Sequence, residues 1–412
     1  MGKGKSDIVV IDVGSANVRV LGARPTPNGD IEIFATGEHA SLGVERGIVT
    51  KIDDASYGIK AALEHAGLDL KARGFDVYAT VGGKHVSSFN HCAEVNLSRK
   101  DGLVTEKDVE RAIGASRLVS LQPEASLVHA ITRGFRVDGY LCRRSPIGMR
   151  GSTVGAESHV ITANSAGLKN LRKAVQMAGR EPDGFISNAI AAGQAVLSQA
   201  EKDNGAVVID IGAGSTDVAA FIEGAPFHTA SIPVGGNQIA NDLAVALNTA
   251  FHVAERLYRE EGSGSSAGVS PTDELTVPCF GLTGTRTLRR LFLNDVIRLR
   301  LQEILSMAYL TARNAGTELP QGAPAVITGG VANLRAMEAL AGDALDVTVR
   351  VGKPIQLHGL PPELMDPRFA TAVGAMRLAA DPNFDMTEAR HGGAYSPIRL
   401  LPQWRGLRAG AA

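Results

Sequence analysis

The chain of 412 residues carries 42 Lys and Arg against 43 Asp and Glu, so its formal net charge is -1. This even balance gives the chain no overall electrostatic attraction for nucleic acid, and we expect no nucleic-acid partner. The hydrophobic content of 44% excludes a disordered chain, and the length predicts two or three domains at roughly 150 residues each.

An apolar run near the start of the chain is repeated in its second half. The residues VVIDVGS at 9–15 recur as VVIDIGA at 207–213. Each run is β-branched, too short for a helix, ends in Asp-x-Gly and precedes a second apolar run, which predicts a strand, a tight turn and another strand. The chain therefore consists of two related halves, each with its own hairpin.

A series of helices and strands connects the two hairpins. Residues 85–162 differ in character from their surroundings, and we interpret them as an inserted α+β module. A helix predicted there over 105–116 begins with a capping box of Thr105 and Asp108. The other predicted elements are a helix over 53–66 with Asp53 or Asp54 as its N-cap, strands over 76–81, 130–137 and 158–163, and helices over 165–178 and 186–202.

The second half continues with longer helical patterns. Residues 261–268, EGSGSSAG, form a low-complexity segment that we expect to be a flexible loop projecting from the surface. The remaining predicted elements are helices over 237–260, 286–311 and 367–378, and a strand over 325–327 that runs into another glycine pair.

The two Asp-x-Gly turns carry the residue types that bind a polyphosphate. Glycines let phosphate approach backbone N–H groups, hydroxyl and amide side chains donate to its oxygens, and carboxylates hold Mg²⁺ through water. The candidates are Gly14, Gly212, Gly214, Gly329 and Gly330 for backbone approach, Ser15, Asn17, Ser215 and Thr216 as donors, and Asp12 and Asp210 for the metal. A single Asp-x-Gly turn is common in ordinary β-hairpins, but the presence of two such turns favours a phosphate-binding site. The sequence has no Walker A loop and no complete Rossmann fingerprint.

With these motifs the sequence resembles the actin-like ATPase superfamily. Residues 12–15 and 210–217 are similar to its two phosphate motifs, residues 328–330 to its adenosine motif, and residues 187–197 and 369–376 to its two connecting helices. The resemblance implies an α/β, actin-like (ribonuclease-H-like) duplicated two-domain fold with a nucleotide cleft and a small inserted α+β subdomain. It also implies ATP and Mg²⁺ as cofactors.

Within that superfamily the sequence resembles the FtsA family of bacterial cell-division proteins, from about residue 7 to about residue 380. The resemblance rests on GVERGIV at 43–49 with Asp53 after it, GFRVDG at 134–139, SPIGM at 145–149 and SHVIT at 158–162. The middle two stretches are the more specific, because they lie in the module that this family has in place of a usual actin subdomain.

The resemblance implies a division of the chain into five parts. These are subdomain 1A (7–84, with 163–206 and 369–380 returning to it), the inserted subdomain 1C (85–162), subdomain 2A (207–245 and 324–368), subdomain 2B (246–323), and a linker with a candidate membrane-targeting segment (381–412).

The function that the resemblance implies is that of a peripheral protein on the cytoplasmic face of the cell membrane. Such a protein binds ATP, polymerises into filaments and tethers FtsZ filaments to the membrane at the division septum. We expect its partners to be the FtsZ C-terminal peptide, the membrane surface and further copies of the chain. Two alternatives with the same nucleotide site stay open: a PilM-like type IV pilus assembly protein, and a small-metabolite kinase.

The resemblance also extends to the nucleoside contacts, with one departure. Gly235 and Gly236 match a glycine pair beside the nucleotide, and Glu255 matches the acidic residue of an Ala-Glu-x-x-Lys motif whose lysine position is Tyr258 here. Tyr258 either stacks on adenine or packs within an amphipathic helix, and the sequence leaves both open.

Hydrolysis of ATP needs a group that positions water against the γ-phosphate. Chaperone-type relatives carry a Glu at the start of the first connecting helix, where this chain has ISNA at 186–189. We therefore expect ATP binding with slow or negligible hydrolysis, and no catalytic residue is assigned.

The tail matches the position of the amphipathic membrane helix of the family. Leu400, Leu401, Trp404 and Leu407 share one helical face, with Arg405 and Arg408 outside it. Because Pro402 and Gly406 weaken a helix, a frayed tail is the alternative.

An arginine cluster marks the candidate partner surface. Arg286, Arg289 and Arg290 begin the helix predicted over 286–311, in the subdomain on which the family docks the FtsZ peptide. These side chains are candidates to pair with the carboxylates of the peptide, and a solvated helix face is the alternative.

Overall fold

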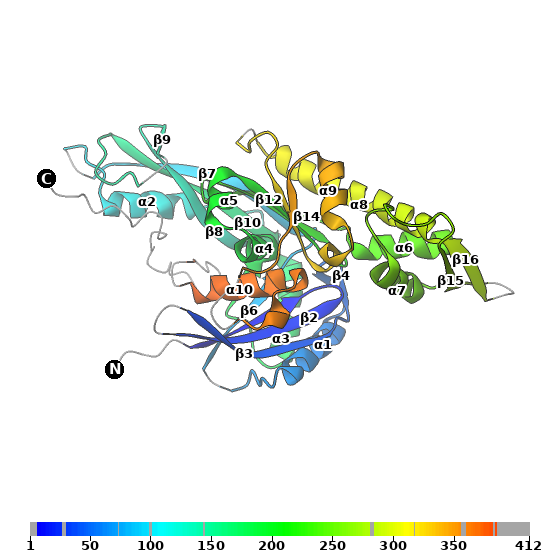
Figure 1. The fold of residues 1–412 in the computed structure, drawn as a ribbon. Coiled ribbons are helices and arrows are strands. Elements are labelled where there is room, and N and C mark those ends of the chain that lie inside the picture. Colours follow the sequence, from blue (N-terminus) through cyan, green and yellow to red (C-terminus); the bar gives the residue numbers. More distant parts are fainter. Residues whose placement is uncertain are drawn as a thin grey trace.

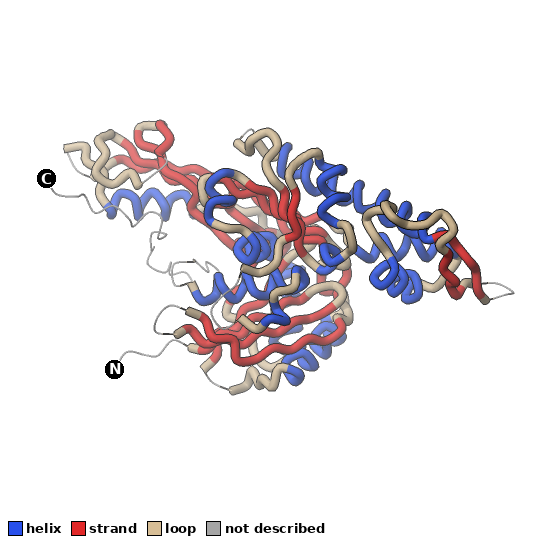
Figure 2. The backbone as a smooth tube through the Cα atoms, in the orientation of Figure 1, coloured by secondary structure: helices blue, strands red, loops and turns tan. Residues whose placement is uncertain are grey.

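The computed structural model describes residues 6–26, 30–72, 74–98, 101–142, 145–280, 284–316, 318–355, 360–381 and 384. Figure 1 shows two α/β halves, one above the other, with an elongated module on one side and a helical lobe on the other. In Figure 2 the strands gather in the interior of the two halves and the helices lie against them. Among the helices of the described part, none combines the length and apolar character needed to cross a bilayer.

The first half is built on a five-stranded sheet with β1 at its centre. The strand order is β11 (Gly184–Ser187), β6 (Phe75–Val81), β1 (Asp7–Val13), β2 (Asn17–Pro25) and β3 (Ile31–Ala40). Strand β1 is antiparallel to β2 and parallel to β6. Helices α1 (Ile52–His65) and α3 (Ser165–Met177) lie on one side of the sheet and α10 (Ala370–Ala380) on the other. The continuous apolar run of β1 follows from this burial on both faces.

The second half repeats the same arrangement. Its strand order is β14 (Ala225–Ile232), β13 (Thr216–Ile222), β12 (Ala206–Ile211), β17 (Ala325–Thr328) and β18 (Val349–Val351), with β12 antiparallel to β13 and parallel to β17. Helix α4 (Asn188–Val196) packs on the face toward the first half, and α8 (Arg290–Arg313) packs on the opposite face. The prediction of a duplicated actin-like fold is therefore confirmed.

The inserted module has its own sheet and its own small core. The strand order is β7 (Val86–Asn96), β10 (Thr153–Asn164), β8 (Ala125–Val137) and β9 (Tyr140–Cys142), and α2 (Glu106–Arg117) packs on it. The predicted capping box is present, because Thr105 and Asp108 exchange side-chain and backbone hydrogen bonds. Edge strand β7 lies along edge strand β14 of the second half, where Ser88 Oγ donates to the Thr229 carbonyl at 2.7 Å.

A helical lobe extends the second half on its far side. It contains α6 (Gly236–Leu247), α7 (Phe251–Glu261), the N-terminal part of α8, and a two-stranded ribbon of β15 (Glu274–Pro278) and β16 (Thr285–Arg289). The remaining elements are β4 (Val44–Glu45), β5 (Ile48–Val49), α5 (Gln199–Asn204), η1 (Gly330–Asn333), α9 (Met337–Leu345), η2 (Pro362–Leu364) and η3 (Pro367–Phe369).

Three predicted helices are wrong in their bounds. Residues 186–202 comprise the end of β11 and two helices, because Leu197 takes extended backbone between α4 and α5. Residues 237–260 are two helices, since Asn248 adopts the left-handed conformation (φ 52°) that ends α6. The long helix starts only at Arg290, because the residues before it pair with β15.

Two local predictions are also wrong. The N-cap of α1 is Lys51, and Asp53 and Asp54 stand in the first turn, where their charge favours the positive end of the helix dipole. The segment 261–268 does not simply project: Gly262 and Gly264 are buried, and Ser263 N–H donates to Asn294 Oδ1 at 3.1 Å.

Candidate functional site

The two Asp-x-Gly turns face each other across one cavity of about 340 Å³. Gly214 of the second turn lies against Ser15 of the first, since a Cβ atom on Gly214 would stand 2.5 Å from Ser15 Oγ. Ser15 Oγ in turn accepts a hydrogen bond from the Gly47 N–H at 3.0 Å. The two turns therefore form opposite walls of a single site, as the duplicated motif predicts.

Close backbone approach explains the glycines of these walls. A Cβ atom on Gly14 would lie 2.9 Å from the Asn17 carbonyl oxygen. Gly329 adopts φ +88°, and its Cβ atom would stand 2.3 Å from Asp210 Oδ1. Side chains larger than hydrogen would thus fill the walls, and with glycine the backbone itself lines the cavity, which suits an anion held by N–H groups.

Helices α4 and α10 cross at one end of the cavity. Gly374 of α10 lies against Ala191 of α4, because a Cβ atom on Gly374 would stand 1.8 Å from the Ala191 carbonyl oxygen. Asn188 at the start of α4 and Thr371 in α10 both line the cavity. Asn188 Oδ1 is buried and accepts no hydrogen bond from any described residue, so it is free to accept one from water or a ligand.

The first hairpin supplies a carboxyl group with its own positive neighbour. Thr80 Oγ1 donates to Asp12 Oδ1 at 2.8 Å, and Arg19 Nη1 lies 3.7 Å from Asp12 Oδ2. Arg19 also forms an ion pair with Glu38 at 3.0 Å. Burial raises the pKa of Asp12, and the positive charge of Arg19 offsets part of that rise.

The second hairpin holds two carboxyl groups. Thr371 Oγ1 donates to Asp210 Oδ2 at 2.5 Å, and Asn188 Nδ2 donates to Asp217 Oδ2 at 3.2 Å. Burial raises the pKa of Asp210 to about 7, and the nearby Asp217 carboxyl adds to this rise. Burial likewise raises the pKa of Asp217 to about 6. A cation in the cavity would stabilise the ionised form of both groups.

The carboxyl groups suit a hydrated metal ion. In the described part of the chain, no three His, Cys, Asp or Glu side chains gather closely enough to form a metal site of their own. Asp12 and Asp210 line the cavity from opposite hairpins. Two carboxylates and a phosphate chain match the way Mg²⁺ is held in nucleotide sites, where it keeps several waters.

Most of the residues predicted for the site line this cavity. They are Asp12, Gly14, Ser15, Asn17, Asp210, Gly212, Gly214, Ser215, Gly236, Glu255, Tyr258, Gly329 and Gly330. Thr216 does not line it: its Oγ1 donates to the Val234 carbonyl at 2.8 Å, so the hydroxyl is turned away from any phosphate. Gly235 supports the wall from behind, with a Cβ position only 2.5 Å from the Gly212 carbonyl oxygen.

Several lining residues are missing from the sequence-based set. They are Ala16, Arg19, Asn188, Asp217, Asn237, Arg259, Asn333, Leu334, Arg368 and Thr371, among others. A signal existed for two of them: Arg19 and Asp217 follow their aspartates at the same spacing in the repeat, and the hairpin register pairs each with that aspartate.

Tyr258 and Glu255 lie on α7, which forms one wall of the cavity. Tyr258 is only 8% exposed, and its hydroxyl stands 2.9 Å from the position of a Cβ atom on Gly236. Burial raises the pKa of Tyr258 to about 12, so the phenol is neutral. Glu255 forms an ion pair with Arg259 at 3.4 Å. The tyrosine therefore packs against the start of α6 and still contributes to the cavity surface.

The structure separates the three arginines of the candidate partner surface. Arg290 is engaged by Glu261 at 2.6 Å and Asp273 at 2.8 Å. Arg286 and Arg289 are exposed on β16, at positions whose side chains point to opposite faces of the ribbon. The prediction that all three begin one helix is wrong, because residues 285–289 form a strand and the helix starts at Arg290.

Leu400, Leu401, Trp404, Arg405, Leu407 and Arg408, the candidate membrane-binding residues, fall outside the described residues.

Two family models match the chain. One, described as "Cell division protein FtsA", matches residues 207–374. The other, described as "SHS2 domain inserted in FTSA", matches residues 83–162, which are nearly the residues of the inserted module.

Whole-length relatives carry the same description. The chain is 32% identical to "Cell division protein FtsA" of Neisseria meningitidis serogroup B, over 93% of this chain and 93% of that protein. It is 30% identical to the protein of that name from Pseudomonas aeruginosa, over 94% and 93%. The identity to the Escherichia coli K12 protein is 29%, over 91% and 90%.

Solved structures share the fold at lower sequence identity. A PilM–PilN type IV pilus biogenesis complex matches with a TM-score of 0.61 and 17% identity, covering 90% of this chain and 98% of that chain. MreB5 of Spiroplasma citri bound to ADP matches with a TM-score of 0.54 and 13% identity, covering 90% and 95%. At these identities the likeness supports the actin-like fold alone.

Proposed function

Because the chain belongs to the FtsA family of bacterial cell-division proteins, we propose that it binds ATP, polymerises on the cytoplasmic face of the membrane and tethers FtsZ filaments there. The observation that carries the proposal is the pair of glycine-lined hairpins that face each other across one cavity with buried carboxyl groups. The five-part division into subdomains 1A, 1C, 2A and 2B and the tail belongs to the same proposal.

The cavity would hold the nucleotide with its phosphates between the two hairpins. The backbone of Gly14, Gly212 and Gly214 and the hydroxyls of Ser15 and Ser215 would donate to phosphate oxygens. Asp12 and Asp210 would hold Mg²⁺ through water, and the metal would supply positive charge between the phosphates and these carboxylates. MreB5, which shares the fold, has been solved with ADP, and this agrees with a nucleotide in such a cleft.

The nucleoside would occupy the end of the cavity between α7 and η1. Gly236, Glu255 and Tyr258 line this end, together with Gly329, Gly330 and Leu334. Because Tyr258 is neutral, it offers no positive charge to the nucleotide, and the cation of α7 that lines the cavity is Arg259. Tyr258 therefore contributes packing and ring contact rather than an ion pair.

Hydrolysis would be slow. The position at the start of α4 is Asn188, whose amide is held by Asp217 and which has no basic group to accept a proton. A nucleotide that stays bound in the cleft would regulate assembly by its presence, and assembly would not depend on rapid hydrolysis.

The FtsZ C-terminal peptide would dock on the helical lobe. The exposed cations on β16 are Arg286 and Arg289, and exposed aromatic side chains of the lobe include Phe280 at 62% exposure. A mixed cationic and aromatic surface suits an acidic peptide with apolar residues.

The PilM-like alternative is not favoured. The family models and the whole-length relatives name FtsA, whereas the pilus complex matches in fold at 17% identity. Pilus assembly therefore rests on the fold alone.

One sedimentation experiment tests the proposal. The purified chain is pelleted with anionic vesicles in the presence of ATP and Mg²⁺, with and without a fluorescent FtsZ tail peptide. We expect lipid- and nucleotide-dependent pelleting that carries the peptide down. A chain that stays in the supernatant under all these conditions would contradict the proposal.

A further inference from the structure

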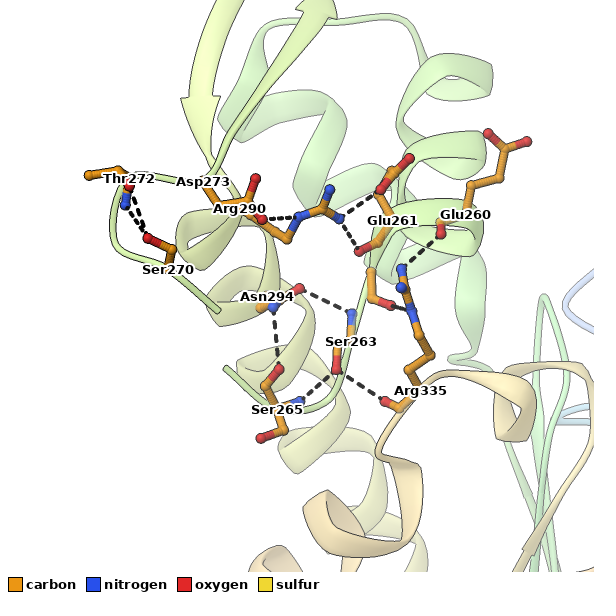
Figure 3. A network of polar contacts seen from close by, with 11 residues as sticks. Glu260, Glu261, Ser263, Ser265, Ser270, Thr272, Asp273, Arg290, Asn294 and Arg335 are labelled. Atoms are coloured by element: carbon orange, nitrogen blue, oxygen red, sulfur yellow. Dashed lines mark hydrogen bonds and ion pairs between the residues drawn. The ribbon is translucent and has the colours of Figure 1, made fainter. Parts of the chain in front are cut away.

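The C-terminal end of α7 is held by two arginines from different elements (Figure 3). Arg335 donates from Nη2 to the Glu260 carbonyl at 2.8 Å and from Nε to the Gly262 carbonyl at 3.2 Å. Arg290 donates from Nη1 to the Glu261 carbonyl at 3.2 Å. Three successive carbonyl groups, which a helix end leaves without partners, are thus bound by guanidinium groups, whose charge favours that end of the helix dipole.

The chain after α7 is fastened to the same place. The Gly264 N–H donates to the Arg335 carbonyl at 2.8 Å, and Ser263 forms a parallel bridge with Arg335. Asn294 of α8, which is 1% exposed, accepts from Ser263 N–H at 3.1 Å and donates to the Ser265 carbonyl at 3.3 Å. The low-complexity segment 261–268 is therefore ordered by contacts with other elements, which its composition does not predict (Figure 3).

Arg335 connects two walls of the cavity. It follows directly after Asn333 and Leu334, which line the cavity from the η1 side. On the other side, α7 presents Glu255 and Tyr258 to the same cavity. Since α7 is a single helix of 11 residues, a shift at its C-terminal end moves these two side chains with it.

We propose that Arg335 is a positioning residue for the nucleoside end of the cleft. Its guanidinium holds α7 at a fixed distance from η1 and so sets the gap between Tyr258 and Leu334. Arg335 does not itself line the cavity, so it acts through the backbone of α7. The inference rests on the proposed nucleotide function and adds to it a residue outside the known motifs.

The test compares three variants of the full chain. Arg335→Ala removes both side-chain hydrogen bonds, and Arg335→Lys keeps the charge but loses the planar fork that reaches two carbonyl groups. The matched control is Arg313→Ala, since Arg313 also donates to a backbone carbonyl, that of Pro320 at 3.1 Å, but lies away from the cavity.

Two measurements are made on each variant. The first is hydrogen exchange over residues 251–262 without nucleotide, which we expect to become about tenfold faster in Arg335→Ala and less so in Arg335→Lys. The second is the Kd of a fluorescent ATP analogue with Mg²⁺, which we expect to rise about tenfold in Arg335→Ala. The free energy that corresponds to a tenfold change in Kd is similar to that of a hydrogen bond to a charged group. The control should change neither quantity.

The outcomes separate this inference from the proposed function. Faster exchange in Arg335→Ala with an unchanged Kd would overturn the positioning role while leaving nucleotide binding intact. Unchanged hydrogen exchange would show that the Arg335 side chain does not hold the C-terminal end of α7. If the wild-type chain binds no nucleotide, the proposed function fails and the positioning role fails with it, and the exchange data alone then report whether Arg335 holds α7. Should Arg335→Ala not fold, Arg335→Lys carries the same two measurements.

Discussion

Arg19 and Asp217 occupy equivalent positions in the two hairpins, and they carry opposite charges. Arg19 pairs with Asp12 across β1 and β2, and Asp217 pairs with Asp210 across β12 and β13. The first hairpin therefore brings its own positive charge, whereas the second places two buried carboxyl groups together. In the proposed site the nucleotide would thus face one nearly neutral wall and one acidic wall, and a bound cation would stabilise the ionised carboxyl groups of the acidic wall.

This asymmetry predicts a pH-dependent affinity for nucleotide with Mg²⁺. The pKa of Asp210 is raised to about 7, so below pH 7 the group is largely protonated and a metal must displace a proton. We expect the affinity for a fluorescent ATP analogue with Mg²⁺ to rise between pH 6 and pH 8. If binding displaces one proton, the affinity should increase by up to about tenfold for each pH unit below the pKa of Asp210. Titrations at pH 6, 7 and 8 measure it.

The variant Asp217→Asn distinguishes the titration of the protein from the titration of the nucleotide phosphates in that experiment. Removing the neighbouring carboxyl lowers the pKa of Asp210, since Asp217 contributes to its rise. The increase in affinity should then occur at lower pH, while the titration of the phosphates is the same for both proteins. Identical pH profiles for wild type and variant would count against the acidic wall as the metal side.

The ribbon geometry predicts that the arginines of β16 differ in their effect on peptide binding. Arg289 lies opposite Glu274 in the register, whereas Arg286 lies opposite Val277 and has no acidic cross-strand neighbour. We expect Arg286→Glu to weaken an FtsZ tail peptide about five- to tenfold and Arg289→Glu less than about twofold. Fluorescence anisotropy at low and high salt measures both, and the loss should shrink as salt screens the charge. Equal effects of the two reversals would show that the faces of the ribbon do not matter.

The position of Asn188 predicts slow turnover. Because the amide of Asn188 cannot accept a proton from water as a carboxylate at that position would, we expect a single-turnover rate constant far below about 1 s⁻¹, the low end of ordinary enzymes. Quenched reactions with excess protein over labelled ATP measure this rate. Asp12→Asn is the control, because a residual rate that does not fall in this variant belongs to a contaminating ATPase and not to the cleft. A fast rate that does fall would contradict the prediction.

The proposed anchor predicts a lipid effect that leaves the rest of the chain intact. Deleting residues 396–412 removes the apolar face that includes Trp404 and Leu407. We expect the truncated chain to lose sedimentation with anionic vesicles and to keep its affinity for the tail peptide, because β16 lies outside the deleted residues. Undiminished sedimentation would identify the tail as frayed chain rather than as an anchor.

Features of the fold and the site that depend on local sequence could be predicted, and features that depend on distant contacts could not. The hairpins and their aspartates are local, so the repeat alone places Asp12 and Asp210 in one site. Thr371 and Leu334 reach that site from distant segments. The resemblance places Thr371 in a connecting helix, but neither local sequence indicates that its side chain lines the site. The segment 261–268 has the composition of a flexible loop, yet Asn294 and Arg335 order it from other elements. In each case the missing information is tertiary contact.

The contact between β7 and β14 predicts a dependence of stability on pH. His159 Nδ1 lies 2.7 Å from Asn90 Oδ1, and Nε2 lies 3.1 Å from Thr229 Oγ1. Burial lowers the pKa of His159 to about 3 from the ordinary 6.5. Repulsion from Arg133, and from His228 and His129 when they are protonated, adds to this shift. Between these pH values the unfolded chain binds the proton that the folded chain does not, so stability is full above about pH 6.5 and falls as the pH decreases.

His159→Gln isolates this contribution, because glutamine keeps an amide for hydrogen bonding and does not titrate. Between pH 6 and pH 5, the wild type should lose about 1.2 kcal/mol more unfolding free energy than the variant. This is slightly less than the value of one full proton per pH unit, because the unfolded imidazole is only about three-quarters protonated at pH 6. Asp210 and Asp217, whose raised pKa values act in the opposite direction, are present in both proteins and cancel in the comparison. Urea unfolding at pH 7, 6 and 5 gives the two slopes. Parallel slopes would mean that His159 accepts its proton in the folded chain, and that the β7–β14 contact does not keep the imidazole neutral.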